Sequence, residues 1–242
     1  KSSLKEVNDG DVIKIGKFEV EFIPVTHSVP HAFAASYTTK AGTVVHSGDF
    51  KIDHSPIDGR RTDLARFGEI GNTKNVVLLM SDSTGAEKPG TTGSESSVKT
   101  SIDRIFLEHS DKRIVVSTFA SHIHRIIQIV ESAIANGRKV AFLGRSLHTN
   151  LEVVKKLKIY EIAKKHLIDI EEIDNFANDK ICIIATGSQG EPLSALSLVA
   201  SGQSRFISID ENDCVVFSSH TIPGNEMGVN RIINGLMRRG AT

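Results

Sequence analysis

Residues 113–143 read RIVVSTFASHIHRIIQIVESAIANGRKVAFL, and this stretch decides the fold. Its first part, 113–119, is an apolar run rich in β-branched side chains, which predicts a strand. Residues 121–136 carry apolar side chains at helical spacing and are followed by Gly137, which predicts a helix and its end. A second apolar run over 139–143 predicts another strand. Two strands joined through a helix are typical of a parallel sheet.

The same alternation continues on both sides of this stretch. Further helices are predicted over 94–109, 146–157 and 192–200, and a further strand over 181–185. Strands that alternate with helices predict an α/β fold, in which a parallel sheet is flanked by helices. In such sheets, ligands bind beyond the carboxyl ends of the strands.

The first part of the chain is instead rich in short strands separated by glycines. The unbroken apolar run VVLLM at 76–80 predicts a strand buried on both faces. The other strands are predicted over 12–15, 18–25, 34–39 and 43–47.

Two changes of pattern predict the domain organisation. Residues from Ser83 onward are rich in Gly, Ser and Thr, which favours a domain boundary. Near the end, predicted strands over 205–209 and 214–218 return to the style of the first part. We therefore predict a first domain over 1–82, an inserted domain over 83–204, and a return to the first domain over 205–242.

Composition narrows the classes of function. Lys plus Arg and Asp plus Glu both number 29, so a polyanion has to be met by a local basic patch rather than by a global field. Cys182 and Cys214 lie in apolar runs, which favours buried thiols in a reducing compartment. No run is long and apolar enough for a membrane span or a signal peptide. The first residues already have a turn-and-strand pattern, so we expect the sequence to begin inside a folded unit.

His27 and Asp49 each follow a predicted strand, and Asp82 follows another. Imidazole and carboxylate groups brought to one sheet edge suit Zn²⁺ or Mn²⁺. Alternatively, His27 caps a loop and Asp49 starts a turn. Asp82 either orients a metal ligand or caps the turn that follows it.

Polar loops at 117–124, 144–147 and 186–192 each follow a predicted strand and open a helix. Free backbone N–H groups and the positive end of a helix can hold an anion there, and Arg125 could meet a phosphate. Each loop could instead be only a tight turn, and His122 and His124 could simply bond backbone carbonyls.

Seven segments together carry a family resemblance. They are, in chain order, THS (26–28), HSGDFKID (46–53), SDST (81–84), STFASHIHR (117–125), LGRS (143–146), ATGSQGEP (185–192) and IPGNE (222–226). In this order the segments resemble ribonuclease J, a family of the metallo-β-lactamase superfamily with a β-CASP insertion. The resemblance implies part of a metallo-β-lactamase αββα sandwich with an inserted β-CASP domain.

By this resemblance, His27 matches a metal-ligand motif, Asp49 the bridging carboxylate and Asp82 an acidic motif, and these residues form the expected catalytic set. Further residues match loops that line the RNA channel and its 5′-phosphate end. The expected RNA and phosphate contacts are Ser121, His124, Arg125, Gly144, Arg145, Ser146, Gly187, Ser188, Gln189 and Glu191.

The resemblance also implies an activity. It is hydrolysis of RNA phosphodiester bonds, as a 5′-3′ exonuclease and an endonuclease, in cytoplasmic RNA processing and decay. Two Zn²⁺ ions, or Mn²⁺ or Mg²⁺, are the implied cofactors of the full-length enzyme. The implied partners are single-stranded RNA with a 5′-monophosphate, further copies of the enzyme in a dimer or tetramer, and other RNA-decay proteins.

Some motifs of the family do not occur in the sequence. The His-x-His-x-Asp-His signature is missing, and the Ser-Gly-His and Pro-Val-His-Gly motifs would lie beyond Thr242. We therefore expect an internal fragment that retains no metal and is inactive alone.

Three alternatives stay open at this point. The chain could be an RNA-binding or oligomerisation module without catalysis. It could belong to a β-CASP relative that acts on DNA or on the ends of pre-messenger RNA. A small-molecule hydrolase such as a lactamase or glyoxalase is disfavoured, because such enzymes do not need the long insertion of strands and helices.

Overall fold

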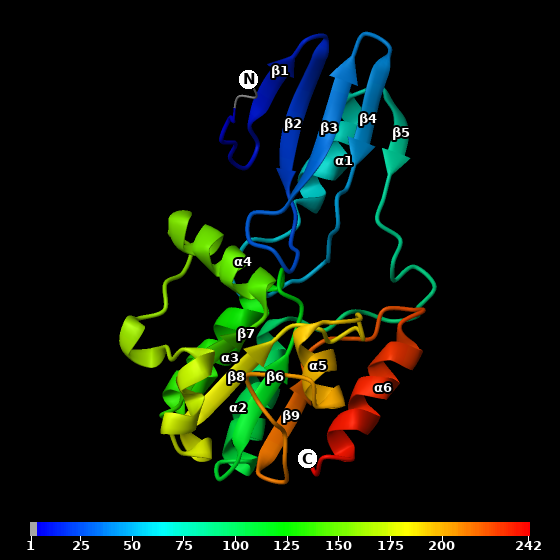
Figure 1. The fold of residues 1–242 in the computed structure, drawn as a ribbon. Coiled ribbons are helices and arrows are strands. Elements are labelled where there is room, and N and C mark those ends of the chain that lie inside the picture. Colours follow the sequence, from blue (N-terminus) through cyan, green and yellow to red (C-terminus); the bar gives the residue numbers. More distant parts are fainter. Residues whose placement is uncertain (1–3) are drawn as a thin grey trace. The chain divides into compact units, whose positions relative to one another are not determined.

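The structure, a computed structural model, describes residues 4–242. The chain divides into two compact units at the bond between Ser97 and Val98, and each unit has its own sheet (Figure 1). The structure thus divides the chain after Ser97 rather than after residue 82.

A five-stranded sheet with the order β1-β2-β3-β4-β5 forms the first unit. Successive strands from β1 to β4 pair antiparallel, and β5 runs parallel to β4. The helix α1 (Leu64–Thr73) contributes Ile70 to a core with Ile23 and Val45 of the sheet. The strands are β1 (Val12–Ile15), β2 (Phe18–Pro24), β3 (Phe33–Thr39), β4 (Gly42–His46) and β5 (Val76–Met80).

A buried carboxylate fastens α1 to this sheet. Glu21 of β2 is 2% exposed and accepts hydrogen bonds from Arg66 Nε and, at 3.1 Å, from Lys74 Nζ. The bond from Arg66 holds the pKa of Glu21 below its usual value. The ionised Glu21 therefore keeps both cations, and with them α1, in place over the sheet.

The edge strand β5 differs from the prediction. Val77, Leu78 and Leu79 are 60%, 50% and 60% exposed. Because successive side chains of a strand point to opposite faces, these values mean that both faces of β5 are open. Within residues 4–242, β5 also pairs only with β4 and ends the sheet. The prediction of a strand buried on both faces is therefore wrong for this chain.

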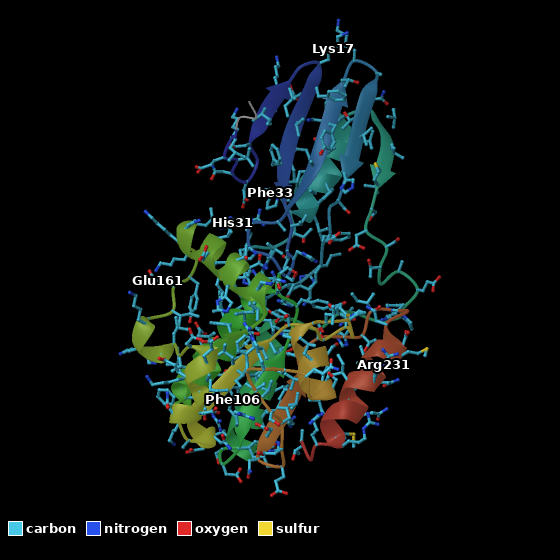
Figure 2. All side chains as sticks on the ribbon, in the orientation of Figure 1. Lys17, His31, Phe33, Phe106, Glu161 and Arg231 are labelled. Atoms are coloured by element: carbon cyan, nitrogen blue, oxygen red, sulfur yellow. The ribbon has the colours of Figure 1, made fainter. Side chains whose placement is uncertain are left out.

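A four-stranded parallel sheet with the order β7-β8-β6-β9 forms the second unit, and the predicted parallel sheet flanked by helices is confirmed. Helices α2, α3 and α4 pack on one face, and α5 and α6 on the other. Phe106 of α2 is 1% exposed, inside this unit (Figure 2). The elements are α2 (Ser96–Glu108), β6 (Arg113–Ser117), α3 (Ile123–Ala135), β7 (Lys139–Leu143), α4 (Arg145–Lys156), the 3₁₀ turns Lys164–His166, Ile170–Asn175 and Asn178–Lys180, β8 (Ile181–Ala185), α5 (Ala195–Ser201), β9 (Asp213–Phe217) and α6 (Glu226–Met237).

The end of the chain also differs from the prediction. Residues 205–242 belong to the second unit, because β9 pairs in parallel with β6. Arg113 of β6 makes a buried ion pair with Asp213 of β9, with Nε–Oδ1 at 2.6 Å. The prediction that this segment returns to the first domain, and that 205–209 is a strand, is corrected accordingly; Ile207 and Ile209 instead cover the core beside α5 and α6.

Both cysteines are free and buried, as predicted. Ile114 of β6 pairs with Cys182 on one side and Cys214 on the other, so the two thiols stand two strands apart. That spacing is roughly 9–10 Å, beyond the reach of a disulfide. Burial raises the pKa of Cys182 to about 12.

Within residues 4–242, no helix combines the length and the apolar character that a membrane crossing needs.

Candidate functional site

The carboxyl ends of β8, β6 and β9 lie side by side and lead into polar loops. β6 continues into α3 and β8 into α5, and in the order β7-β8-β6-β9 these connections leave in opposite directions. α3 and α5 accordingly pack on opposite faces of the sheet. In open α/β sheets, such a change of direction creates the crevice in which ligands bind.

Ser218, just after β9, joins the loops that follow β6 and β9. Its carbonyl accepts from Thr118 Oγ1 at 3.3 Å and from Arg125 Nη1 at 3.0 Å. Its hydroxyl oxygen lies 2.7 Å from the same Arg125 nitrogen. These bonds place the guanidinium of Arg125 at the carboxyl edge of the sheet.

The neighbouring residues of this loop are placed differently from one another. Ser121 is exposed, whereas His124, in the first turn of α3, is buried with 8% exposure. His122 caps the helix, since its Nδ1 accepts from the Arg125 N–H at 3.3 Å. Ser121 therefore offers more surface to a ligand than His124 does.

The first part of the loop after β8 is buried, over residues 187–189. Ser188 and Gln189 are 3% and 5% exposed. The side-chain amide of Gln189 donates to the His220 carbonyl at 2.9 Å and accepts from the Ile222 N–H at 2.8 Å. Glu191 holds the same loop, because its Oε2 accepts from the Gln189 N–H at 3.2 Å. The loop after β8 is thus bound directly to the one after β9.

Gly187 is required by close packing within this loop. Its φ is +101°, and a Cβ there would lie 2.2 Å from Ser194 Oγ. Only glycine accommodates both the backbone conformation and the contact.

The loop after β7 borders a cavity of about 650 Å³. Gly144 precedes α4 with a φ of +134°, and a Cβ there would lie 2.4 Å from Thr186 Oγ1. Gly144 makes no side-chain cap, and Arg145 and Ser146 begin the helix at the cavity. The described residues that line it include two arginines, Arg145 and Arg205, and no carboxylate. The size and the mostly apolar lining are typical of a small-molecule or nucleotide pocket.

In the first unit, the structure gathers His27, Asp49 and Asp82 at strand ends. Thr26, before His27, shares an isolated bridge with Lys51, two residues after Asp49. Asp82 accepts from the N–H and the hydroxyl of Thr84 at 2.9 and 2.7 Å. The two hydrogen bonds from Thr84 hold the pKa of Asp82 below its usual value, and a hydrogen bond from the Phe50 backbone and the charge of His27 add to this effect.

These residues do not amount to a metal site. Within residues 4–242, the structure contains no group of three or more His, Cys, Asp or Glu side chains that could hold an ion. The other histidines nearby are placed elsewhere: His46 Nδ1 accepts from the Gly48 N–H at 3.0 Å, and His31 lies exposed in the loop between β2 and β3 (Figure 2). The donor set in the described chain does not fit the two-metal centre that the resemblance implies.

A sequence model of the family described as "Ribonuclease J, beta-CASP domain" matches residues 111–236, more than half of the chain. The chain belongs to the ribonuclease J family. The matched region contains β6 to β9 and the helices between them, so the parallel sheet with its polar edge is the β-CASP domain. The family predicted from the motifs is confirmed.

Relatives from three bacteria give the same result. The chain is 42% identical over 241 residues to the ribonuclease J of Helicobacter pylori (strain ATCC 700392 / 26695), a match that covers 100% of this chain and 35% of that protein. It is 43% identical over 236 residues to the ribonuclease J of Mycobacterium tuberculosis (strain ATCC 25618 / H37Rv), covering 98% and 42%. For the ribonuclease J of Synechocystis sp. PCC 6803 the identity is 41%, covering 100% and 38%. The chain thus spans less than half the length of these relatives.

A solved structure has a similar fold. A protein of unknown function from Enterococcus faecalis V583 matches 100% of this chain and 55% of its own, with a TM-score of 0.65 and 16% identity. At this identity the likeness concerns the fold alone.

Sequence reasoning missed two parts of the site. Ser218, the common partner of Thr118 and Arg125, lies in a segment that the pattern assigned to the first domain. Arg205 and Phe206 line the cavity but were read as part of a strand. The polar residues of QSR at 203–205, just after Gly202, were the available signal for a loop.

Proposed function

We propose that this chain is the RNA-holding core of a metal-dependent ribonuclease that hydrolyses phosphodiester bonds as a 5′-3′ exonuclease and an endonuclease in RNA processing and decay. The observation that carries the proposal is the joined set of loops at the carboxyl ends of β8, β6 and β9. In an α/β sheet this edge is where ligands bind.

In this proposal, the edge recognises the RNA backbone and its 5′-monophosphate. Exposed Ser121 and the guanidinium of Arg125 lie on one side of the crevice. The proposed contacts on the other side are backbone groups of Gly187 and Ser188, which follow β8. Arg145 and Ser146 extend the surface at the start of α4. Cations, hydroxyls and backbone N–H groups bind phosphates without reading base edges, so binding is expected to be nearly independent of sequence.

The catalytic part of the proposal rests on the family. His27 and Asp49 are proposed as metal ligands and Asp82 as the residue that orients them, with Zn²⁺ as the metal and Mn²⁺ or Mg²⁺ as alternatives. Because the described residues provide no complete ligand set, we expect the chain alone to retain almost no metal and to leave RNA uncut. Mass-spectrometric metal analysis after incubation with Zn²⁺ and desalting checks this, and about two retained ions per chain would contradict it.

For the full-length enzyme we propose a cytoplasmic location, assembly into a dimer or tetramer, and association with other RNA-decay proteins. These proposals rest on the resemblance alone.

The test of the proposed function is RNA affinity. The chain is titrated against a 5′-monophosphorylated single-stranded oligoribonucleotide and the same RNA with a 5′-hydroxyl, by fluorescence anisotropy. We expect tighter binding of the phosphorylated RNA. Arg145→Gln is expected to weaken binding about tenfold and to reduce the salt slope by roughly 0.7, the value for one lost phosphate contact on a single strand.

Arg104→Gln is the matched control, because Arg104 is an exposed residue of α2 whose side chain pairs with Glu108 at 3.8 Å. We expect this variant to bind as the wild type does. Equal affinity for both RNAs, together with no effect of Arg145→Gln, would contradict the proposal. Binding without any cleavage by the metal-loaded full-length enzyme would instead favour an RNA-binding module without catalysis.

A further inference from the structure

The side-chain amide of Gln189 is used at both ends. Its Nε2 donates to the His220 carbonyl at 2.9 Å, and its Oε1 accepts from the Ile222 N–H at 2.8 Å and from Asn225 Nδ2 at 3.4 Å. The opposite amide orientation would set an NH₂ group against the Ile222 N–H, so the contacts fix which end is which. With 5% exposure, the side chain has little surface left for a ligand.

A backbone contact supports these bonds. Gly190 has a φ of +79°, and a Cβ there would lie 2.3 Å from the carbonyl carbon of Gly228, in the first turn of α6. The two glycines therefore let the β8–α5 loop and α6 touch backbone to backbone. The hydrogen bonds of Gln189 and this backbone contact together hold the segment 219–225, which connects β9 and α6, against the loop after β8.

The same stretch of chain is held from its other side by Arg125. Ser218 immediately precedes the segment 219–225, and both its carbonyl and its hydroxyl contact Arg125 Nη1. A shift of the segment 219–225 would therefore move Ser218, and with it the guanidinium at the carboxyl edge.

We infer that Gln189 is a positioning residue, which makes no contact with RNA and fixes the segment 219–225 so that Ser218 and Arg125 keep their places at the edge. The inference rests on the proposed RNA binding at that edge. Within the loop sequence GSQGE, Gln189 and Gly190 therefore have a structural role, and they do not contact the phosphate.

The test compares Gln189→Met with the wild type in the full chain. Methionine has a similar length but cannot replace either hydrogen bond, so the His220 carbonyl and the Ile222 N–H lose their partner. We expect hydrogen exchange to become faster in the segment 219–225 and to stay unchanged in β6 and α3. Affinity for the 5′-monophosphorylated oligoribonucleotide is expected to fall by about tenfold, because a loosened segment 219–225 no longer holds Ser218 and Arg125 at the edge. Glu108→Met, at the exposed carboxyl end of α2 in the same unit, is the control and is expected to change neither quantity.

A second variant, Gln189→Glu, separates positioning from contact and serves if Gln189→Met does not fold. Its carboxylate keeps an acceptor oxygen for the Ile222 N–H but has no donor for the His220 carbonyl. If Gln189 positions the segment, the exchange protection of 219–225 and the RNA affinity should therefore fall together. A residue that touches phosphate would instead lose most affinity with glutamate, because like charges repel, and would leave the exchange of 219–225 unchanged in both variants.

Lost affinity with unchanged exchange, or faster exchange with full affinity, would overturn the inference. If the wild type binds no RNA, the proposed function fails, and the inference about Gln189 fails with it. If the wild type binds RNA and Gln189→Met changes neither the exchange of 219–225 nor the affinity, the inference alone is overturned.

Discussion

At the scale of single residues, Gly190 shows how closely the loop after β8 approaches α6. A side chain at this position would meet the Gly228 backbone at 2.3 Å, at a φ of +79°. Gly224 has a comparable φ of +95°, but nothing lies within 4 Å of a Cβ built there. Comparing substitutions at Gly190 and Gly224 therefore separates the free-energy cost of the backbone conformation from that of the steric contact.

We predict that Gly190→Ala destabilises the protein more than Gly224→Ala does. Both variants pay about 1–2 kcal/mol for a left-handed backbone, and only Gly190→Ala adds an overpacking cost of about 1–3 kcal/mol. Urea denaturation gives the free energy of unfolding of each variant. Equal losses in the two variants would contradict the backbone contact.

Asp53 supports a pH prediction. Its carboxylate is 5% exposed; burial alone would raise its pKa, but hydrogen bonds from the Ser55 and Glu95 N–H groups and from Ser94 lower it to about 2. In the unfolded chain the pKa of an aspartate is about 3.9. Because the folded-state pKa is lower, the ionised Asp53 stabilises the folded protein at pH values above about 3.9, and this contribution is lost as the pH falls through the folded-state pKa.

Asp53→Asn is therefore predicted to cost about 2 kcal/mol at pH 7. The difference from the wild type should shrink steadily as the pH is lowered from about 5 to about 2, because the wild type then loses its ionised carboxylate. Urea denaturation over this pH range is the measurement, and a difference that does not depend on pH would show that the hydrogen bonds do not favour the ionised form.

Residue types and order in the sequence were enough to find the loops but not the orientation of each side chain. The loop 186–192 was predicted as a phosphate loop because Gly and Ser follow a strand. Which of its side chains turn inward depends on α6 and on the segment 219–225, which are distant in sequence. For this reason the prediction grouped Gln189 with exposed candidates such as Ser121.

At the scale of elements, β9 decides where the second unit ends. Asp213 is 0% exposed and accepts from Arg113 Nε at 2.6 Å, from Arg113 Nη2 at 2.8 Å and from the Asp210 N–H at 2.9 Å. This pair fixes the amino ends of β9 and β6 side by side.

Asp213→Asn is predicted to destabilise the protein by about 3–5 kcal/mol, because it leaves the guanidinium of Arg113 buried and uncompensated. The free energy of unfolding in urea is the quantity to compare. Glu108→Gln is the control, since Glu108 and Arg104 form an exposed pair and such pairs contribute about 0–1 kcal/mol. Similar losses in both variants would contradict a stabilising role of the buried pair.

Strand and helix patterns predicted most elements correctly but not which sheet each strand joins. Both β5 and β9 are short apolar runs. The sequence of β5 suggests burial on both faces, yet the strand lies exposed at an edge, and β9 joins the second sheet rather than the first. Pairing depends on distant partners such as Arg113, which a local pattern does not contain.

At the scale of the whole molecule, the chain has the β-CASP domain of ribonuclease J as its second unit, and its first unit carries the metal-site candidates His27, Asp49 and Asp82. The motif order predicted the family correctly, because short loop motifs keep their order whatever the side-chain geometry. The missing motifs led to the expectation of an incomplete ligand set, whereas the placement of the remaining candidates depends on elements that converge in space. Within residues 4–242 the structure gathers only part of such a set.

Hydrogen exchange of the chain with and without a 5′-monophosphorylated single-stranded oligoribonucleotide tests the central claim most directly. We predict slower exchange in the loops after β6, β7, β8 and β9, around 118–125, 144–147, 186–191 and 218–222. The opposite edge of the sheet, around 109–112 and 136–138, should be unchanged. No slowing in any of these loops at saturating RNA, or slowing only at the opposite edge, would contradict the account.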